Sequence, residues 1–122
     1  MSDNDVTFEE LKGVAKAFTD ERDWERYHTP KDLAIGVITE ASELLEHFRF
    51  KSEKEAASML KDPVKRKEIG SELADVLYFV LRFAQKFDFD ISTEFRAKME
   101  ENAKKYPVEK SRGLNKKYTE YE

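Results

Sequence analysis

The chain has 122 residues, which is enough to bury one hydrophobic core but too few for two. It contains no cysteine, which excludes disulfides, thiolate metal sites and thiol nucleophiles. The net charge of −4 argues against a general nucleic-acid-binding protein, although residues 98–118 carry seven Lys or Arg against three Glu.

Neither end of the sequence nor its apolar runs indicate a membrane protein. The start, Met1–Asp5, is acidic and has no apolar stretch of the kind found in signal peptides. The longest strongly apolar run, Val76–Ala84, is interrupted by Arg82 and is too short to cross a bilayer. We therefore expect a soluble cytoplasmic protein without a membrane partner or a nucleic-acid partner.

The first half of the chain predicts two long helices. Thr7–Glu10 has the spacing of a capping box and precedes apolar residues at helical spacing, so a helix is expected from Phe8 to about Arg26. Thr29 followed by Pro30 is a typical helix start, and the apolar spacing predicts that this second helix ends near Phe48.

The second half predicts one short helix and two longer ones. A second capping-box spacing at Ser52–Glu55 predicts a short helix that ends near Lys61. Asp62 and Pro63 then begin a long helix that reaches about Phe87. The last helix is expected over Ile91–Tyr106, where Pro107 stops it.

These elements predict an all-α fold, a four-helix bundle with one additional short helix, in a single domain spanning 1–122. Residues 107–122 are expected to form an extended polar tail ordered by a partner or ligand. The expected core positions are Phe8, Leu11, Val14, Ala15 and Phe18; Leu33, Val37, Ala41, Leu44, Leu45 and Phe48; and Ile91, Phe95, Met99, Ala103 and Tyr106.

Four acids stand in places that ought to be apolar. Glu40 and Glu43 form one i, i+3 pair, Glu72 and Asp75 form another, and apolar residues flank each pair at helical spacing. One such pair is usually exposed to solvent and has no function. Burying four carboxylates together, however, is unfavourable unless they are protonated, paired with bases or bound to a cation. Oxygen-only ligands favour Mg²⁺, Mn²⁺ or Ca²⁺ over zinc. Glu46 is left out of this set because it is expected to turn outward.

A di-iron bundle would need Glu-x-x-His on two helices. Only His28 has a glutamate three residues before it, Glu25, whereas Leu44 stands three residues before His47, so the second motif is missing and that alternative is excluded.

The acid pairs and their flanks resemble the MazG-like group of the all-α NTP pyrophosphohydrolase superfamily, and in particular its dCTP pyrophosphatase subgroup. The motif residues are Glu40-Ala-Ser-Glu43 and Glu72-Leu-Ala-Asp75. Further likeness lies in residues 21–28, in Lys98–Asn102 with Lys105-Tyr-Pro107, and in Asn115–Glu120. The likeness runs in register over nearly the whole chain from Phe18 onward.

This resemblance implies hydrolysis of a nucleoside triphosphate between the α and β phosphates. The four acids would hold Mg²⁺, with Mn²⁺ as a possible substitute, and one acid or a neighbouring glutamate would orient the attacking water. Lys98, Asn102 and Lys105 match the family's phosphate-binding positions, and their spacing places them on one stripe of the last helix.

Four residues are the predicted contacts to the nucleobase: Trp24, His28, Phe50 and Phe79. Aromatic side chains stack on bases, and His28 could hydrogen-bond to the base or merely buttress the helix junction. Two departures from the cytidine-preferring relatives bear on specificity, because Phe50 replaces a Trp and Ala15 replaces a His. A mixed dCTP and dATP preference and a broad housecleaning role both remain open.

The resemblance also implies a homo-oligomer, more readily a tetramer than a dimer, that closes the metal site. Two other functions remain open: a non-catalytic module that binds nucleotide and metal, and a pyrophosphohydrolase acting on phosphoribosyl-ATP. A purely structural coiled coil is disfavoured, because acids at buried positions would oppose it.

Overall fold

The computed structural model describes all 122 residues and contains helices and no strand, which confirms the predicted all-α class. The chain divides into two compact units, Met1–Asp88 and Phe89–Glu122, which are described separately. The first unit contains α1 (Phe8–Glu21), η1 (Glu25–Tyr27), α2 (Pro30–Glu46), α3 (Glu53–Met59) and α4 (Pro63–Lys86). The second contains α5 (Ile91–Lys105), α6 (Val108–Ser111) and η2 (Tyr118–Glu120).

The helix starts lie where side-chain caps predict them. Thr7 Oγ1 accepts a hydrogen bond from the Glu10 amide, and the Glu10 carboxylate accepts one from the Thr7 amide, both at 3.1 Å. The side chains of the N-caps Thr29, Ser52, Asp62 and Asp90 likewise accept a hydrogen bond from the amide three residues later. These bonds satisfy amides that have no partner within the helix.

Three helix ends differ from the prediction, and the short third helix ends at Met59 instead of near Lys61. The first helix ends at Glu21 instead of Arg26, because Asp23 takes a positive φ of 54° and the chain turns into the separate 3₁₀ turn η1. The second ends at Glu46 instead of Phe48, shortly before Phe50 takes a positive φ of 63°. Left-handed backbone at a single residue cannot continue a right-handed helix.

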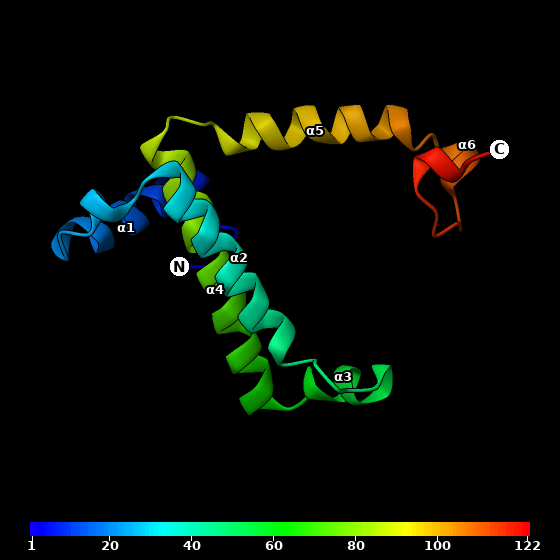
Figure 1. The fold of residues 1–122 in the computed structure, drawn as a ribbon, viewed down its shortest axis with the longest axis horizontal. Helices are drawn as coiled ribbons and strands as arrows, with labels where there is room; N and C mark the ends of the chain where they lie inside the picture. The colour runs from blue at the N-terminus through cyan, green and yellow to red at the C-terminus, as the bar shows by residue number, and fades with distance from the viewer. The chain divides into compact units, whose positions relative to one another are not determined.

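In the first unit, α2 packs along α4, and α1 packs against α4 from another direction (Figure 1). The buried apolar residues of this packing are Ala15, Leu33, Ile69, Leu81 and Ala84. Leu33, near the beginning of α2, is 0% exposed. The apolar face of α2 is therefore buried at this end of the helix, as the helical spacing predicts.

A glycine lets α2 and α4 approach closely. A Cβ built on Gly36 would lie 2.4 Å from both Cδ1 and Cε1 of the Phe79 ring, so the ring occupies the space where a side chain would be. We expect Gly36→Ala to displace Phe79 and to lower the free energy of unfolding by about 1–3 kcal/mol in a urea titration.

Gly70 provides the matched control for Gly36. A Cβ at Gly70, which is also mid-helix, would meet nothing within 4 Å. Gly70→Ala should therefore stabilise the protein by about 0.5–1 kcal/mol through helix propensity. Equal effects of the two substitutions would contradict the close contact.

Two buried polar side chains hold the first unit together besides the apolar core. Thr19, 0% exposed, donates from Oγ1 to the Ala15 carbonyl at 2.8 Å and lies 2.5 Å from Tyr78 Oη. Arg82, 1% exposed, donates from Nε to His28 Nδ1 at 3.1 Å and lies 3.5 Å from the Glu25 carboxylate. The Thr19 contact joins α1 to α4, and the Arg82 contacts join the segment around η1 to α4.

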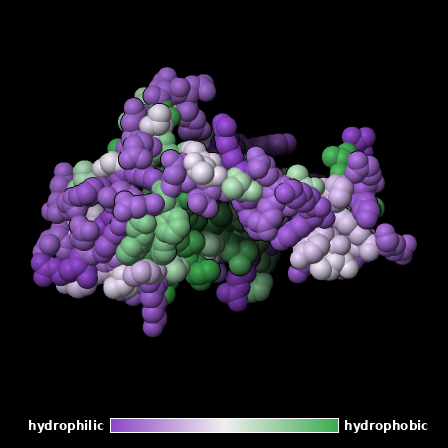
Figure 2. Space-filling view, turned by 90° about the horizontal axis from the view of Figure 1, so that it is seen from above, coloured by the Kyte–Doolittle hydropathy of each residue, from purple (hydrophilic) through white to green (hydrophobic).

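Many of the predicted core residues are exposed within one chain. Leu45 is 67% exposed and Phe95 is 62% exposed, and Phe8, Val14, Phe18, Met99 and Tyr106 are also exposed, so their predicted burial was wrong for a single chain. Figure 2 shows hydrophobic side chains reaching the surface between hydrophilic ones. Helical spacing identifies an apolar face, but not what covers it. None of the helices combines the length and the hydropathy needed to cross a membrane.

The second unit corrects the expectation of an extended tail. After Pro107 the chain forms α6 and the 3₁₀ turn η2, and the Tyr106 ring lies edge-on to Tyr118 and Tyr121 at 5.8 and 6.0 Å. Ser111 Oγ also donates to the Pro107 carbonyl at 2.7 Å. Packing of aromatic rings supplies order that the polar composition did not indicate.

Candidate metal centre and nucleotide site

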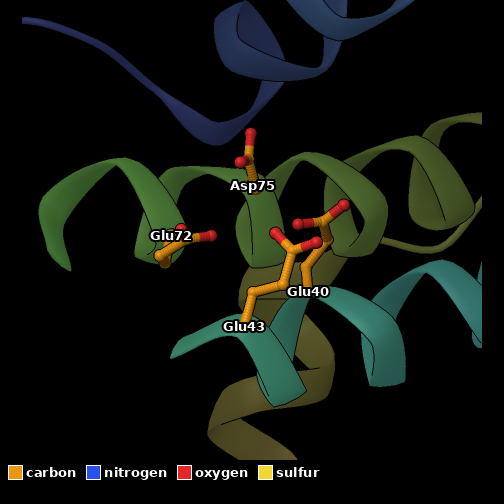
Figure 3. A group of neighbouring side chains, drawn as sticks. All are labelled: Glu40, Glu43, Glu72 and Asp75. Carbon is orange, nitrogen blue, oxygen red and sulfur yellow. The ribbon is translucent and has the colours of Figure 1, made fainter. Parts of the chain in front are cut away.

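The structure brings the four predicted acids together. Glu40 and Glu43 come from successive turns of α2, and Glu72 and Asp75 come from successive turns of α4, which packs alongside it (Figure 3). One carboxylate oxygen from each residue lies within 4.8 Å of those of the other three. Each pair shares a helical face because of its i, i+3 spacing, and helix packing joins the two pairs.

The electrostatics of this acid cluster fit a hard cation. Burial, a hydrogen bond with Glu43 and the charges of Glu43, Asp75 and Glu72 raise the pKa of Glu40 to about 7. Oε2 of Glu40 and Oε2 of Glu72 are buried and have no hydrogen-bond partner. Carboxylate oxygens that repel one another and lack donors are suitable ligands for Mg²⁺ or Mn²⁺, and a bound cation would offset their charge.

The raised pKa of Glu40 predicts how the stability of the metal-free protein depends on pH. The folded protein holds this proton up to about pH 7, whereas the unfolded chain releases it near its ordinary value of 4.5. This group's contribution to the free energy of unfolding is therefore present at acidic pH and is lost as the pH rises from about 4.5 to 7.

Glu40→Gln should remove this contribution to the pH dependence. In EDTA at pH 8, thermal unfolding of the variant should occur about 2–5 °C above that of wild type, and the difference should vanish near pH 4.5. If the unfolding temperatures of the two proteins differed by the same amount at all pH values, Glu40 would not be the group with the raised pKa.

His47 is a neighbour of the cluster that the sequence reasoning missed. Its Nε2 lies 3.4 Å from Glu72 Oε1, and both side chains are mostly buried. Since a carboxylate only accepts, Nε2 must carry the proton in this contact. The contact occupies one oxygen of Glu72 and leaves the buried Oε2 for a metal. His47 follows Glu43 by four residues, a spacing that could have identified it.

We expect His47→Leu to raise the Mg²⁺ concentration for half-maximal turnover by about 10- to 100-fold, because Glu72 loses the donor that orients it. The rate at saturating Mg²⁺ should change much less. His47→Gln, which keeps a donor, should restore part of the metal affinity. A Mg²⁺ titration identical to that of wild type would show that the contact has no orienting role.

Glu46 lies outside the cluster, in agreement with its exclusion. Its side chain is 67% exposed and pairs with Arg49 at 3.6 Å. It is therefore an ordinary surface acid on the same helix as Glu40 and Glu43.

An apolar pocket of about 520 Å³ borders the cluster between α1 and α4. Asp75 belongs to its lining, together with the aromatic residues Phe18, Tyr78 and Phe79. The Tyr78 and Phe79 rings of α4 are edge-on at 5.1 Å, and Ala15 of α1 also lines the pocket. The pocket has the flat apolar surfaces that a nucleobase needs, next to a predicted metal ligand.

The structure brings only one of the four predicted base contacts into this pocket, namely Phe79. Trp24 packs edge-on against Phe18 at 5.8 Å and is 43% exposed. Burial and the charges of Arg82 and Lys86 lower the pKa of His28, whose Nδ1 accepts from Arg82. Phe50 is 88% exposed beneath the Arg49 guanidinium.

The three predicted phosphate contacts, Lys98, Asn102 and Lys105, lie on α5 in the second unit. The ammonium groups of Lys98 and Lys105 lie 3.5 and 3.4 Å from Glu101. A hydrogen bond from Lys105 and the charges of both lysines lower the pKa of Glu101. Lys98 and Lys105 therefore lie on the same face of α5, next to Glu101, and their contact with phosphate stays a prediction.

Comparison with known proteins identifies the family of this chain. The model of the MazG-like family matches residues 35–121. The chain is 35% identical to dCTP pyrophosphatase 1 of Rattus norvegicus and 32% identical to that of Homo sapiens, each over 93% of this chain and 67% of the relative. A crystal structure of a pyrophosphatase from Archaeoglobus fulgidus superposes with a TM-score of 0.75 and 37% identity, covering 81% of this chain and 91% of that one. The chain therefore belongs to the MazG-like family.

Proposed function

We propose that this nucleoside triphosphate pyrophosphohydrolase cleaves deoxynucleoside triphosphates between the α and β phosphates in a Mg²⁺-dependent reaction. The observation that carries the proposal is the cluster of four carboxylates from two packed helices, with two buried oxygens that lack any donor. The rat and human relatives are dCTP pyrophosphatases, which supports a nucleotide substrate.

In this mechanism Glu40, Glu43, Glu72 and Asp75 would hold the metal and, through it, the reacting phosphates. When bound, Mg²⁺ supplies neutralisation of phosphate charge and a water molecule of lowered pKa. His47 keeps Glu72 in place. Lys98, Asn102 and Lys105 contact the phosphates, as the family resemblance implies. Positioning and charge neutralisation dominate catalysis, because phosphoryl transfer requires little covalent chemistry from the protein.

The apolar pocket beside Asp75 is the proposed base site. Phe79 and Tyr78 offer ring surfaces for the base, and Ala15 leaves room in the wall where cytidine-preferring relatives have a His. A wall without that polar group discriminates less between bases. We therefore propose a mixed preference that includes dCTP and dATP, and a role in cytoplasmic nucleotide-pool housecleaning.

The exposed apolar faces support a homo-oligomer, a tetramer more readily than a dimer. Ile35, Ile38 and Leu45 of α2 are at least half exposed, as are Leu73 of α4 and Phe95 of α5. Exposed apolar residues on helix faces are typical of protein–protein contacts. Light scattering coupled to size exclusion should give a mass of several chains, and a monomer would contradict this proposal.

A turnover panel tests the function directly. The dNTPs, NTPs, 5-methyl-dCTP and phosphoribosyl-ATP would each be incubated with Mg²⁺ or EDTA, and the products separated by chromatography. Monophosphate and pyrophosphate, formed only with the metal, are expected from the dNTPs. Orthophosphate release would mean that another bond is cleaved. Nucleotide binding without turnover would favour a non-catalytic module.

A further inference from the structure

The C-terminal segment, residues 107–122, folds back onto the end of α5 and places an aromatic ring against Lys105. The Lys105 ammonium lies over the Tyr118 ring, 5.2 Å from its centroid. A cation within about 6 Å of an aromatic centroid is attracted by the negative face of the ring. Because Lys105 is one of the three predicted phosphate contacts, a residue that holds its ammonium bears on the substrate site.

Glu101 holds the same ammonium from a second side. The Lys105 ammonium lies 3.4 Å from the Glu101 carboxylate, which stands four residues earlier on α5. A glutamate four residues before a lysine is the favourable order for such a helical pair. An ammonium group has three N–H donors, so one directed at the carboxylate and one at the ring leave a third for a phosphate oxygen.

The local structure explains why Tyr118 reaches the end of α5. The chain turns at Gly113, whose φ of 75° lies in the left-handed region that glycine adopts readily. Tyr118 then begins the 3₁₀ turn η2, and the Lys117 amide before it donates to the Glu120 carboxylate at 2.9 Å. The Tyr106 ring, at the end of α5, lies edge-on to the Tyr118 ring at 5.8 Å. These contacts fix the position of the Tyr118 ring.

The exposure of the two lysines on this face of α5 differs. The side chain of Lys105 is 36% exposed and that of Lys98 is 55% exposed, although both pair with Glu101. A mobile lysine loses rotamer freedom when it binds a phosphate, and this loss weakens binding. Since the ring and the carboxylate already confine Lys105, it loses less freedom than a lysine held only by an exposed ion pair.

We infer that Tyr118 is a positioning residue of the substrate site, which holds the Lys105 ammonium in place for the phosphates of the nucleotide through the face of its ring. The inference rests on the proposed function, because the contact between Lys105 and phosphate is part of it. An aromatic ring suits this task better than a second carboxylate, since it confines the cation without adding a negative charge that would repel the phosphates. The C-terminal segment is then part of the substrate site.

Steady-state kinetics with dNTPs tests the role of the ring. Tyr118→Leu should raise KM by about three- to fivefold and leave kcat within about twofold of wild type, because a contact that holds substrate and transition state equally affects KM alone. Tyr118→Phe keeps the ring and should restore the wild-type KM. A fluorinated phenylalanine in place of Tyr118 keeps the ring shape but weakens its negative face, so KM should rise again.

A double-mutant cycle shows whether Tyr118 acts through Lys105. Lys105→Gln should raise KM, and Tyr118→Leu should add nothing in that background. If the two substitutions were additive, Tyr118 would only stabilise the segment and the inference would be wrong. Lys104→Gln is the matched control, since Lys104 lies in the same last turn of α5. It should change neither KM nor the effect of Tyr118→Leu.

Calorimetry with Mg²⁺ and a non-hydrolysable α,β-imido dNTP separates this inference from the proposed function. If wild type turns over dNTPs but Tyr118→Leu changes neither KM nor the affinity for the analogue, the inference is wrong and the function stands. If wild type turns over no dNTP, yet affinity for the analogue falls in Tyr118→Leu and not in Tyr118→Phe, the inference stands and the function is wrong. Absence of binding to wild type would overturn both. Should Tyr118→Leu fail to fold, the fluorinated ring compared with Tyr118→Phe decides in its place.

Discussion

Glu43→Gln and Asp75→Asn should each lower kcat for dNTP hydrolysis by about 100- to 1,000-fold, because each removes one negative ligand from the acid cluster while keeping its shape. The two residues come from different helices, and their oxygens converge within the same 4.8 Å. A loss in both variants would therefore show that one centre, built by α2 and α4 together, carries the reaction.

Glu46→Gln is the control for the acid substitutions. Glu46 lies three residues beyond Glu43 on the same helix, but its side chain is 67% exposed and outside the cluster. Its kcat should stay within about threefold of wild type, as expected for a surface substitution. A large loss of kcat here, or full activity in Asp75→Asn, would contradict the assignment of the centre.

Arg82→Met should lower the free energy of unfolding by about 2–3 kcal/mol in a urea titration. The guanidinium is 1% exposed and bonds to His28 and Gln85, while Glu25 lies 3.5 Å away. Methionine fills a similar volume but leaves His28 Nδ1 without its donor. The segment around η1 would then be held to α4 mainly by Lys86, which donates to the carbonyls of Glu25 and His28.

Arg66→Met is the matched control on the same helix. Arg66 is exposed, and its guanidinium donates only to the Leu60 carbonyl at 3.3 Å. Its replacement should cost less than about 0.5–1 kcal/mol. If the two arginine substitutions destabilised the protein equally, the buried network around Arg82 would not be the cause.

The polar contacts between residues far apart in the sequence were harder to predict than the acid pairs. The acids stood out because charged residues interrupt apolar faces at i, i+3 spacing, which is a local signal. His47 meets Glu72 across 25 residues of sequence, and Tyr78 meets Thr19 across 59. Arg82 was visible in the sequence only as an interruption of an apolar run, although it is among the most buried side chains of the chain. Its partners, His28 and Glu25, become apparent only once α4 packs against η1.

The sequence by itself determined the all-α class, the helix starts at Thr7, Thr29, Ser52 and Asp62, and the acid pairs. Caps and i, i+3 spacings are local features that physical chemistry decides within a few residues. Only the tertiary structure decided that Phe79 packs on Gly36, and that Leu45 and Phe95 stay exposed in one chain. It also placed an apolar pocket beside the acids. These features depend on which helix faces meet, and helical periodicity shows that a face is apolar without specifying its partner.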